Sequence, residues 1–135
     1  MSCKAGIRSA DGRLVILHNN DLHFSFHHFA RFLDVVEDVR RGEADVLLLS
    51  GGDILVRHEQ SWPPDGGFAG YRRRGLEMMA LMNEPGYDAA VLGNHELFVH
   101  GTASREILER AAFPWLAANI EVGAAALPRP RPYVS

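Results

Sequence analysis

The sequence predicts an α/β fold with a largely parallel sheet, because short apolar runs alternate with segments of helical periodicity along its 135 residues. Strands are expected at 13–17, 44–49, 88–92 and 114–120. Several of these runs end in Asp, His or Asn side chains. Because the right-handed crossovers of a parallel sheet bring the strand C-termini to one edge, we expect these polar side chains to converge there.

Three helices are expected between the strands. The first begins at Ser25, a good N-cap, and ends at Gly42, since apolar side chains recur between them at three- and four-residue spacing. The second runs over about 70–83 and stops before Pro85-Gly86, and the third opens at Thr102 or Ser104. The alternation of strand and helix is complete along the chain, with no internal repeat.

The organisation expected is one domain at 13–122, preceded by an N-terminal segment at 1–12 and followed by a Pro/Ala-rich tail at 123–135. Hydrophobic residues make up 47% and charged residues 23%, which is typical of a globular chain and not of a disordered one. A loop at 57–69 contains Pro63-Pro64-Asp65-Gly66-Gly67 and can lie over a site or move freely.

Charge and cysteine content exclude several classes of function. The net charge of −3 offers no electrostatic attraction for nucleic acid or an anionic membrane surface, so neither is expected as a partner. No apolar run approaches the ~20 residues of a membrane span. Cys3 is the only cysteine, which excludes an internal disulfide and a thiolate metal cluster. The ligands of any bound metal must therefore be His, Asp, Glu or Asn.

The first apolar run is too short for a signal-peptide core. As written the chain is therefore expected to be cytoplasmic, and to be periplasmic or secreted if its true N-terminus is missing.

The polar stretches after the first three strands have side chains suited to cation binding. Asp21 and His23 are two residues apart, so both can point to one side of a loop. Asp53 follows two glycines, and its carboxylate can bridge two cations about 3.5–4 Å apart. Asn94 offers a neutral amide oxygen, whereas His95 is expected to point elsewhere, as an acid or transition-state donor.

Each stretch taken alone has a simpler explanation. Asp-x-His pairs are common in solvated loops, Gly-Gly-Asp is most often a turn, and Asn94 can be a helix cap. The combination of all three, in this order and each after a predicted strand, favours a metal site.

The motif set resembles the N-terminal half of a calcineurin-like metallophosphoesterase, in the 5'-nucleotidase and UDP-sugar hydrolase branch. The resemblance covers about residues 13–120. It is carried by 16–23, Gly51-Gly52-Asp53, 86–96 and 113–120.

The resemblance implies a four-layer α/β/β/α sandwich, of which this chain would be the N-terminal half, with two divalent metal ions (Mn, Zn or Fe) at the strand ends. It implies that Asp21 and His23 bind the first metal, Asp53 bridges both, and Asn94 binds the second. A metal-activated water would attack the phosphorus of a nucleotide or other small phosphoester, and His95 would stabilise the transition state or protonate the leaving oxygen.

The sequence departs from the family pattern in two respects. The family supplies three further metal ligands from a later His and a Gly-His-x-His motif, but this chain has no histidine after His100. The aspartate that usually orients the catalytic His is replaced by Phe98. His58 is the best spare ligand candidate and His100 a partial substitute for the aspartate, although an ordinary loop position is the simpler interpretation of both.

Two hypotheses therefore remain open from the sequence. In the first, the chain is the first half of the catalytic domain of a phosphoric ester hydrolase, completed by a longer chain or a second polypeptide. In the second, it is an inactive α/β module that binds at most one metal or a phosphate. Either way, we expect an apolar sheet face without a covering layer, and hence marginal stability or self-association.

Overall fold

The computed structural model describes residues 13–42, 45–56, 67–97, 101–121 and 127–133. The predicted N-terminal segment 1–12, His58 and the stretch Phe98–His100 lie outside the described residues. The described elements are β1 (Val15–Asn19), α1 (Phe26–Gly42), β2 (Val46–Ser50), α2 (Gly67–Asn83), β3 (Ala89–Val91), α3 (Asn94–Leu97), α4 (Gly101–Glu109) and β4 (Trp115–Leu116).

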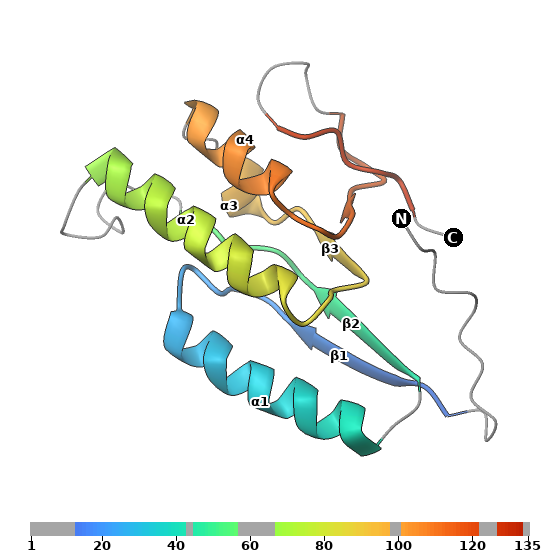
Figure 1. The fold of residues 1–135 in the computed structure, drawn as a ribbon. Helices are drawn as coiled ribbons and strands as arrows, with labels where there is room; N and C mark the ends of the chain where they lie inside the picture. The colour runs from blue at the N-terminus through green and yellow to red at the C-terminus, as the bar shows by residue number, and fades with distance from the viewer. Residues whose placement is uncertain (1–12, 43–44, 57–66, 98–100, 122–126, 134–135) are drawn as a thin grey trace.

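The four strands form one parallel sheet in the order β1-β2-β3-β4, which confirms the predicted α/β class. In the register, Val15 pairs with Val46, Leu49 with Ala89 and Ala90 with Trp115. Because sequential strands are neighbours and all run the same way, the polar stretches after them emerge at the same edge (Figure 1).

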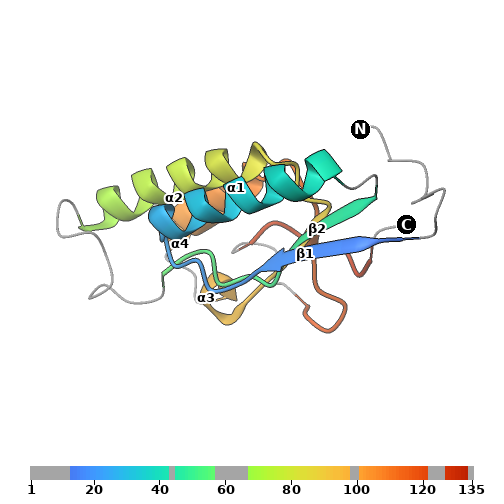
Figure 2. The same cartoon turned by 90° about the horizontal axis from the view of Figure 1, so that it is seen from below.

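The helices α1, α2 and α4 lie on one side of the sheet, while the short α3 follows the end of β3 (Figure 2). The core between helices and sheet contains side chains with no measurable exposure. They include Phe29 from α1, Tyr71, Met78, Met79 and Met82 from α2, Ile107 from α4, Leu48 from β2, and Ile54 and Leu55 from the loop after β2.

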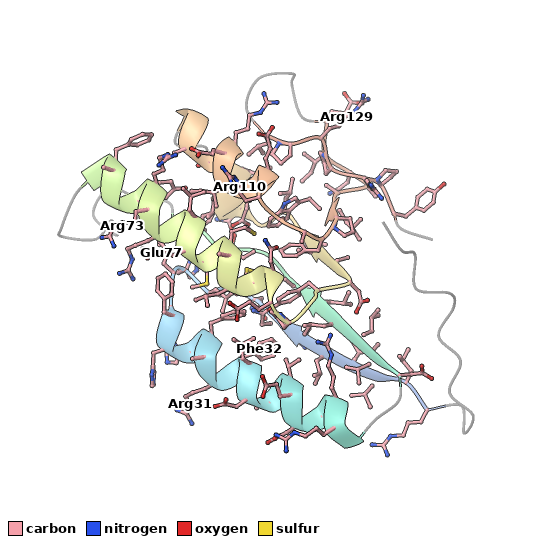
Figure 3. All side chains as sticks on the ribbon, viewed as in Figure 1. Arg31, Phe32, Arg73, Glu77, Arg110 and Arg129 are labelled. Atoms are coloured by element: carbon pink, nitrogen blue, oxygen red, sulfur yellow. The ribbon has the colours of Figure 1, made fainter. Side chains whose placement is uncertain are left out.

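The outward faces of the helices carry charge. Arg31 projects from α1, and Arg73 and Glu77 lie one turn apart on α2 as an exposed ion pair at 3.5 Å (Figure 3). No helix among the described residues combines the length and apolarity needed to cross a bilayer.

The strand predicted at 13–17 corresponds to β1, which the structure places at Val15–Asn19, and its apolar composition suggested a buried strand, which is wrong for one of its faces. Ile16 is 54% exposed and Leu14 41% exposed, whereas Val15 and Leu17 are half-buried under the helices. Periodicity shows that a strand is apolar, but not whether each of its faces has a covering layer.

The same face is only partly exposed on the neighbouring strands. In the observed register, Ile16 shares a face with Leu47 and Leu49 of β2, which are half-buried, and with Ala89 and Val91 of β3, of which Ala89 is buried and Val91 is 43% exposed. Among the described residues, the expected uncovered apolar face is therefore confirmed in part, at the exposed side chains of Leu14, Ile16 and Val91.

The last predicted strand, 114–120, is shorter in the structure, since only Trp115–Leu116 belong to β4. Beyond it the chain pairs with residues of the predicted tail: the N–H of Arg131 donates to Trp115 O, and the N–H of Ala117 donates to Arg131 O. Leu127 is buried as well. Residues 127–133 therefore lie against the edge of the sheet.

Candidate metal centre

The first site loop, which comes after β1, runs beside the loop after β2. The N–H of Asp21 donates to Gly52 O, and the N–H of His23 donates to Asp53 O, each at 3.1 Å. These bonds continue the β1–β2 pairing past the ends of the strands. They hold the predicted Asp-x-His and Gly-Gly-Asp stretches side by side.

Both loops contain strained backbone. Asp21, His23, Phe24 and Asp53 have φ between 45° and 58°, and they are the non-glycine residues with positive φ among the described parts of the chain. Such conformations cost about 1–3 kcal/mol each and concentrate at functional sites. The sequence contains only a weak signal for them, since Asp and His adopt positive φ more often than most residues, whereas Phe24 does not.

The second site loop packs tightly on the turn after β3. A Cβ added to Gly52 would lie 2.5 Å from the N of Gly93, and one added to Gly93 would lie 2.2 Å from Asp53 Oδ1. Gly52 also has φ of +86°. Glycine is therefore required at both positions, one for its conformation and both for the close approach of the two backbones.

These loops bring three possible metal ligands together. One ligand atom each from His23, Asp53 and His95 lies within 4.8 Å of the other two. Asp21 adjoins the cluster, with Oδ1 3.4 Å from His23 Nε2. Asn94 is the first residue of α3 and is exposed. The side chains predicted from three separate stretches of sequence thus occupy one end of the sheet.

Both ring nitrogens of His23 have polar neighbours. Its Nδ1–H donates to Leu55 O at 3.0 Å, which fixes the ring, and its Nε2 faces Asp21 Oδ1 at 3.4 Å, where a cation could bind to both groups. The side-chain hydrogen bond from Asn20 and the nearby His23 lower the pKa of Asp21, against the opposing effect of burial. Asp21 is therefore a carboxylate, the form that binds a metal.

The ring of His95 lies against that of His23, with centroids 4.4 Å apart. Its backbone N–H donates to Asp53 Oδ1 at 2.8 Å. Among the described residues, His95 Nδ1 is buried and has no hydrogen-bond partner. The two imidazoles and the carboxylate, with one buried nitrogen that lacks a partner, fit a site that a bound cation and its phosphate ligand would complete.

A fourth residue of the motif, Glu96, was not assigned a role from the sequence. It is fully buried and accepts four backbone hydrogen bonds, from Asp53, Ile54, Leu55 and Gly93. Burial raises its pKa, and the four N–H donors oppose that rise. The only sequence signal was a carboxylate within a short turn after an apolar run, which is more typical of a solvated residue.

A parallel α/β sheet with His and Asp side chains gathered at its strand ends is typical of an α/β protein with a ligand site at that edge, and these side chains are suited to a metal. Residues 14–128 match the family of calcineurin-like phosphoesterases. The chain belongs to this family, which confirms the resemblance inferred from the motifs.

Curated relatives in this family include 5'-nucleotidases. The chain is 35% identical over 127 residues to human 5'-nucleotidase and 36% identical over 119 residues to the protein UshA of Salmonella pullorum. Each alignment covers 80% of this chain and 20% of the relative. The chain thus spans about a fifth of the length of these relatives.

Solved structures support the fold. The calcineurin-like phosphoesterase YfkN of Bacillus subtilis superposes with a TM-score of 0.65 at 22% identity, covering 90% of this chain and 41% of that one. The NAD nucleotidase of Haemophilus influenzae superposes with a TM-score of 0.62 at 24% identity, and the match covers 78% of this chain and 20% of the nucleotidase. The family is metal-dependent, and the cluster of His23, Asp53 and His95 is a possible metal-binding group in this chain.

Proposed function

We propose that the chain carries the phosphoesterase centre of a 5'-nucleotidase-like hydrolase that acts on nucleotides or similar small phosphoesters. The observation that carries the proposal is the meeting of His23, Asp53 and His95 from three loops within 4.8 Å, in a chain of this family. The names of the 5'-nucleotidase relatives support the substrate class.

In this proposal Asp21, His23, Asp53 and Asn94 would hold two divalent cations, with Asp21 and His23 serving the first, Asn94 the second and Asp53 both. Such cations neutralise phosphate charge and lower the pKa of a bound water. The chain's own contribution is orientation: the His23–Leu55 hydrogen bond fixes one imidazole, and the bond from the His95 N–H fixes one oxygen of Asp53. That leaves Asp53 Oδ2 and His23 Nε2 for the cations.

His95 is the proposed catalytic residue. Its ring is half-buried beside His23 and Asp53, within the cluster that would hold the cations. It would then stabilise negative charge on the transferring phosphoryl group or donate a proton to the leaving oxygen.

The test is hydrolysis of AMP and of an aryl phosphate with and without Mn²⁺. Wild type should show Mn²⁺-dependent phosphate release, and Asp53→Asn should lose it. Asp38→Asn is the matched control, because Asp38 is an exposed carboxylate of α1 that pairs with Arg41. Equal background rates for wild type and Asp53→Asn would refute catalysis by this chain.

One observation favours the alternative of an inactive module that binds a single metal or a phosphate. Among the described residues, the clustered ligand atoms come from His23, Asp53 and His95, a set that can hold a single cation. Calorimetric titration with Mn²⁺ separates the two proposals. One bound ion per chain without hydrolysis supports the module, whereas two bound ions with hydrolysis support the enzyme.

A further inference from the structure

The carboxylate of Glu96 lies between the two turns that carry Asp53 and His95. Its Oε2 accepts the N–H groups of Asp53 at 2.8 Å and Gly93 at 2.9 Å. Its Oε1 accepts those of Ile54 at 2.9 Å and Leu55 at 3.0 Å. One side chain from α3 therefore binds backbone groups some 40 residues away in sequence as well as its own turn.

This arrangement excludes a direct role at the cations. Glu96 has no solvent exposure, and each of its oxygens already accepts two hydrogen bonds. A carboxylate engaged in this way has no lone pair directed at a metal or a substrate. Any effect of Glu96 on the centre must act through the residues it holds.

The residues it holds are those of the proposed centre. The backbone of Asp53 has a φ of 54°, a conformation that persists only when the surrounding structure enforces it. The N–H of Asp53 donates to Glu96, while the Oδ1 of Asp53 accepts the N–H of His95. Asp53 is thus hydrogen-bonded to both Glu96 and His95, which are neighbours in sequence. These two bonds connect the loop after β2 to the start of α3.

We propose that Glu96 is a positioning residue that sets the relative placement of the Asp53 carboxylate and the His95 imidazole. The expected effect of Glu96 on cation binding rests on the proposed function. Its effect on the positions of Asp53 and His95 can be tested in the metal-free protein. The substitution Glu96→Gln tests it, because a glutamine amide replaces one acceptor oxygen by an NH₂ donor. That donor would face two backbone N–H groups and cannot bind them.

Native-state hydrogen exchange of the metal-free full chain, followed by NMR, gives the first measurement. The His95 N–H is the informative group, because it donates to Asp53 and not to Glu96. In Glu96→Gln its exchange should accelerate at least about tenfold more than that of Met79, a fully buried residue of α2 that reports on global stability. Equal acceleration at His95 and Met79 would overturn the proposal.

A second variant covers the case in which Glu96→Gln does not fold. Glu96→Asp keeps the charge and both acceptor oxygens but shortens the reach by one methylene group. It should accelerate exchange at the His95 amide more than at Met79, by a smaller factor than Glu96→Gln. A uniform change across the chain would again contradict positioning.

Mn²⁺ affinity, measured by electron paramagnetic resonance, gives the second measurement. Glu96→Gln should bind Mn²⁺ at least about tenfold more weakly than wild type. Ser104→Ala is the control, because it removes the buried Tyr71–Ser104 hydrogen bond between α2 and α4 and should leave Mn²⁺ affinity unchanged. Wild-type affinity in Glu96→Gln would overturn the proposal.

The two proposals fail in different ways. A wild-type chain that binds no Mn²⁺ or hydrolyses no phosphoester contradicts the proposed function. The exchange measurement uses metal-free protein, so it still decides whether Glu96 places Asp53 and His95.

Discussion

The backbone N–H of His95 donates a 2.8 Å hydrogen bond to Oδ1 of Asp53, across 42 positions of sequence. This contact joins the loop after β2 to the turn after β3. It is possible only because residues 52 and 93 are glycines, whose backbones approach more closely than any Cβ allows. The placement of the Asp53 carboxylate therefore depends on the absence of side chains beside it.

The first prediction concerns Gly93. In Gly93→Ala the new Cβ would lie 2.2 Å from Asp53 Oδ1 and 2.5 Å from its N, so the Asp53 turn must move. We expect a loss of about 1–3 kcal/mol in unfolding free energy, measured by urea titration, together with weaker Mn²⁺ binding. Gly42→Ala, which meets nothing within 4 Å, is the control and should leave both quantities near wild type. Wild-type Mn²⁺ affinity in Gly93→Ala would contradict this account.

The second prediction concerns metal removal. If the cluster binds a divalent cation, Mn²⁺ at about 100 times its Kd should stabilise the fold by about 2.7 kcal/mol, and a chelator should reverse the effect. His23→Ala should abolish this stabilisation, because it removes one of the three clustered ligands. The exposed His27 of α1 supplies the control His27→Ala, which should respond as wild type does. Thermal unfolding with and without Mn²⁺ measures the response.

The third prediction concerns pH. Arg72 of α2 binds Glu106 of α4 through two hydrogen bonds, at 2.6 and 2.7 Å, which lower the pKa of Glu106 from its ordinary value of 4.5. The stabilisation is therefore present above pH 4.5 and disappears as the pH falls through the lowered pKa. Glu106→Gln should reduce the urea midpoint at pH 7, and the difference from wild type should vanish in acid.

The control for this pH effect is Glu109→Gln, which breaks a pair with Arg105 inside α4 and joins no two elements. It should change the midpoint less than Glu106→Gln at pH 7. A Glu106→Gln effect that persists below the lowered pKa would show that its origin is not the ion pair.

The fourth prediction concerns the uncovered sheet face. With Leu14, Ile16 and Val91 exposed on one face, we expect concentration-dependent self-association in sedimentation velocity experiments. Ile16→Lys should weaken association at little cost in stability, since Ile16 is 54% exposed. Val35→Lys places the same charge on a 49% exposed residue of α1 and should not weaken it. A compact wild-type monomer at all concentrations would contradict the prediction.

The order of elements and the location of the centre were predictable from the sequence. Apolar runs separated by periodic segments predict parallel strands, and a parallel sheet brings the loops after its strands to one edge. The loops that carry Asp21, His23, Asp53 and Asn94 could therefore be placed at one edge, and the family recognised, from the sequence. The meeting of the His95 ring with His23 and Asp53 was not predicted, since His95 was expected to point elsewhere. The predicted features depend on local periodicity and chain order, which a sequence records directly.

The tertiary structure decided the features that depend on contacts between distant segments. Glu96 is polar in sequence but fully buried, because four backbone N–H groups of the packed turns satisfy it. The left-handed backbone of Asp53 and the packing of His95 against His23 exist only once the loops are docked. Likewise, the alternation in β1 reveals two faces, but only the position of the helices determines that Ile16 is left exposed.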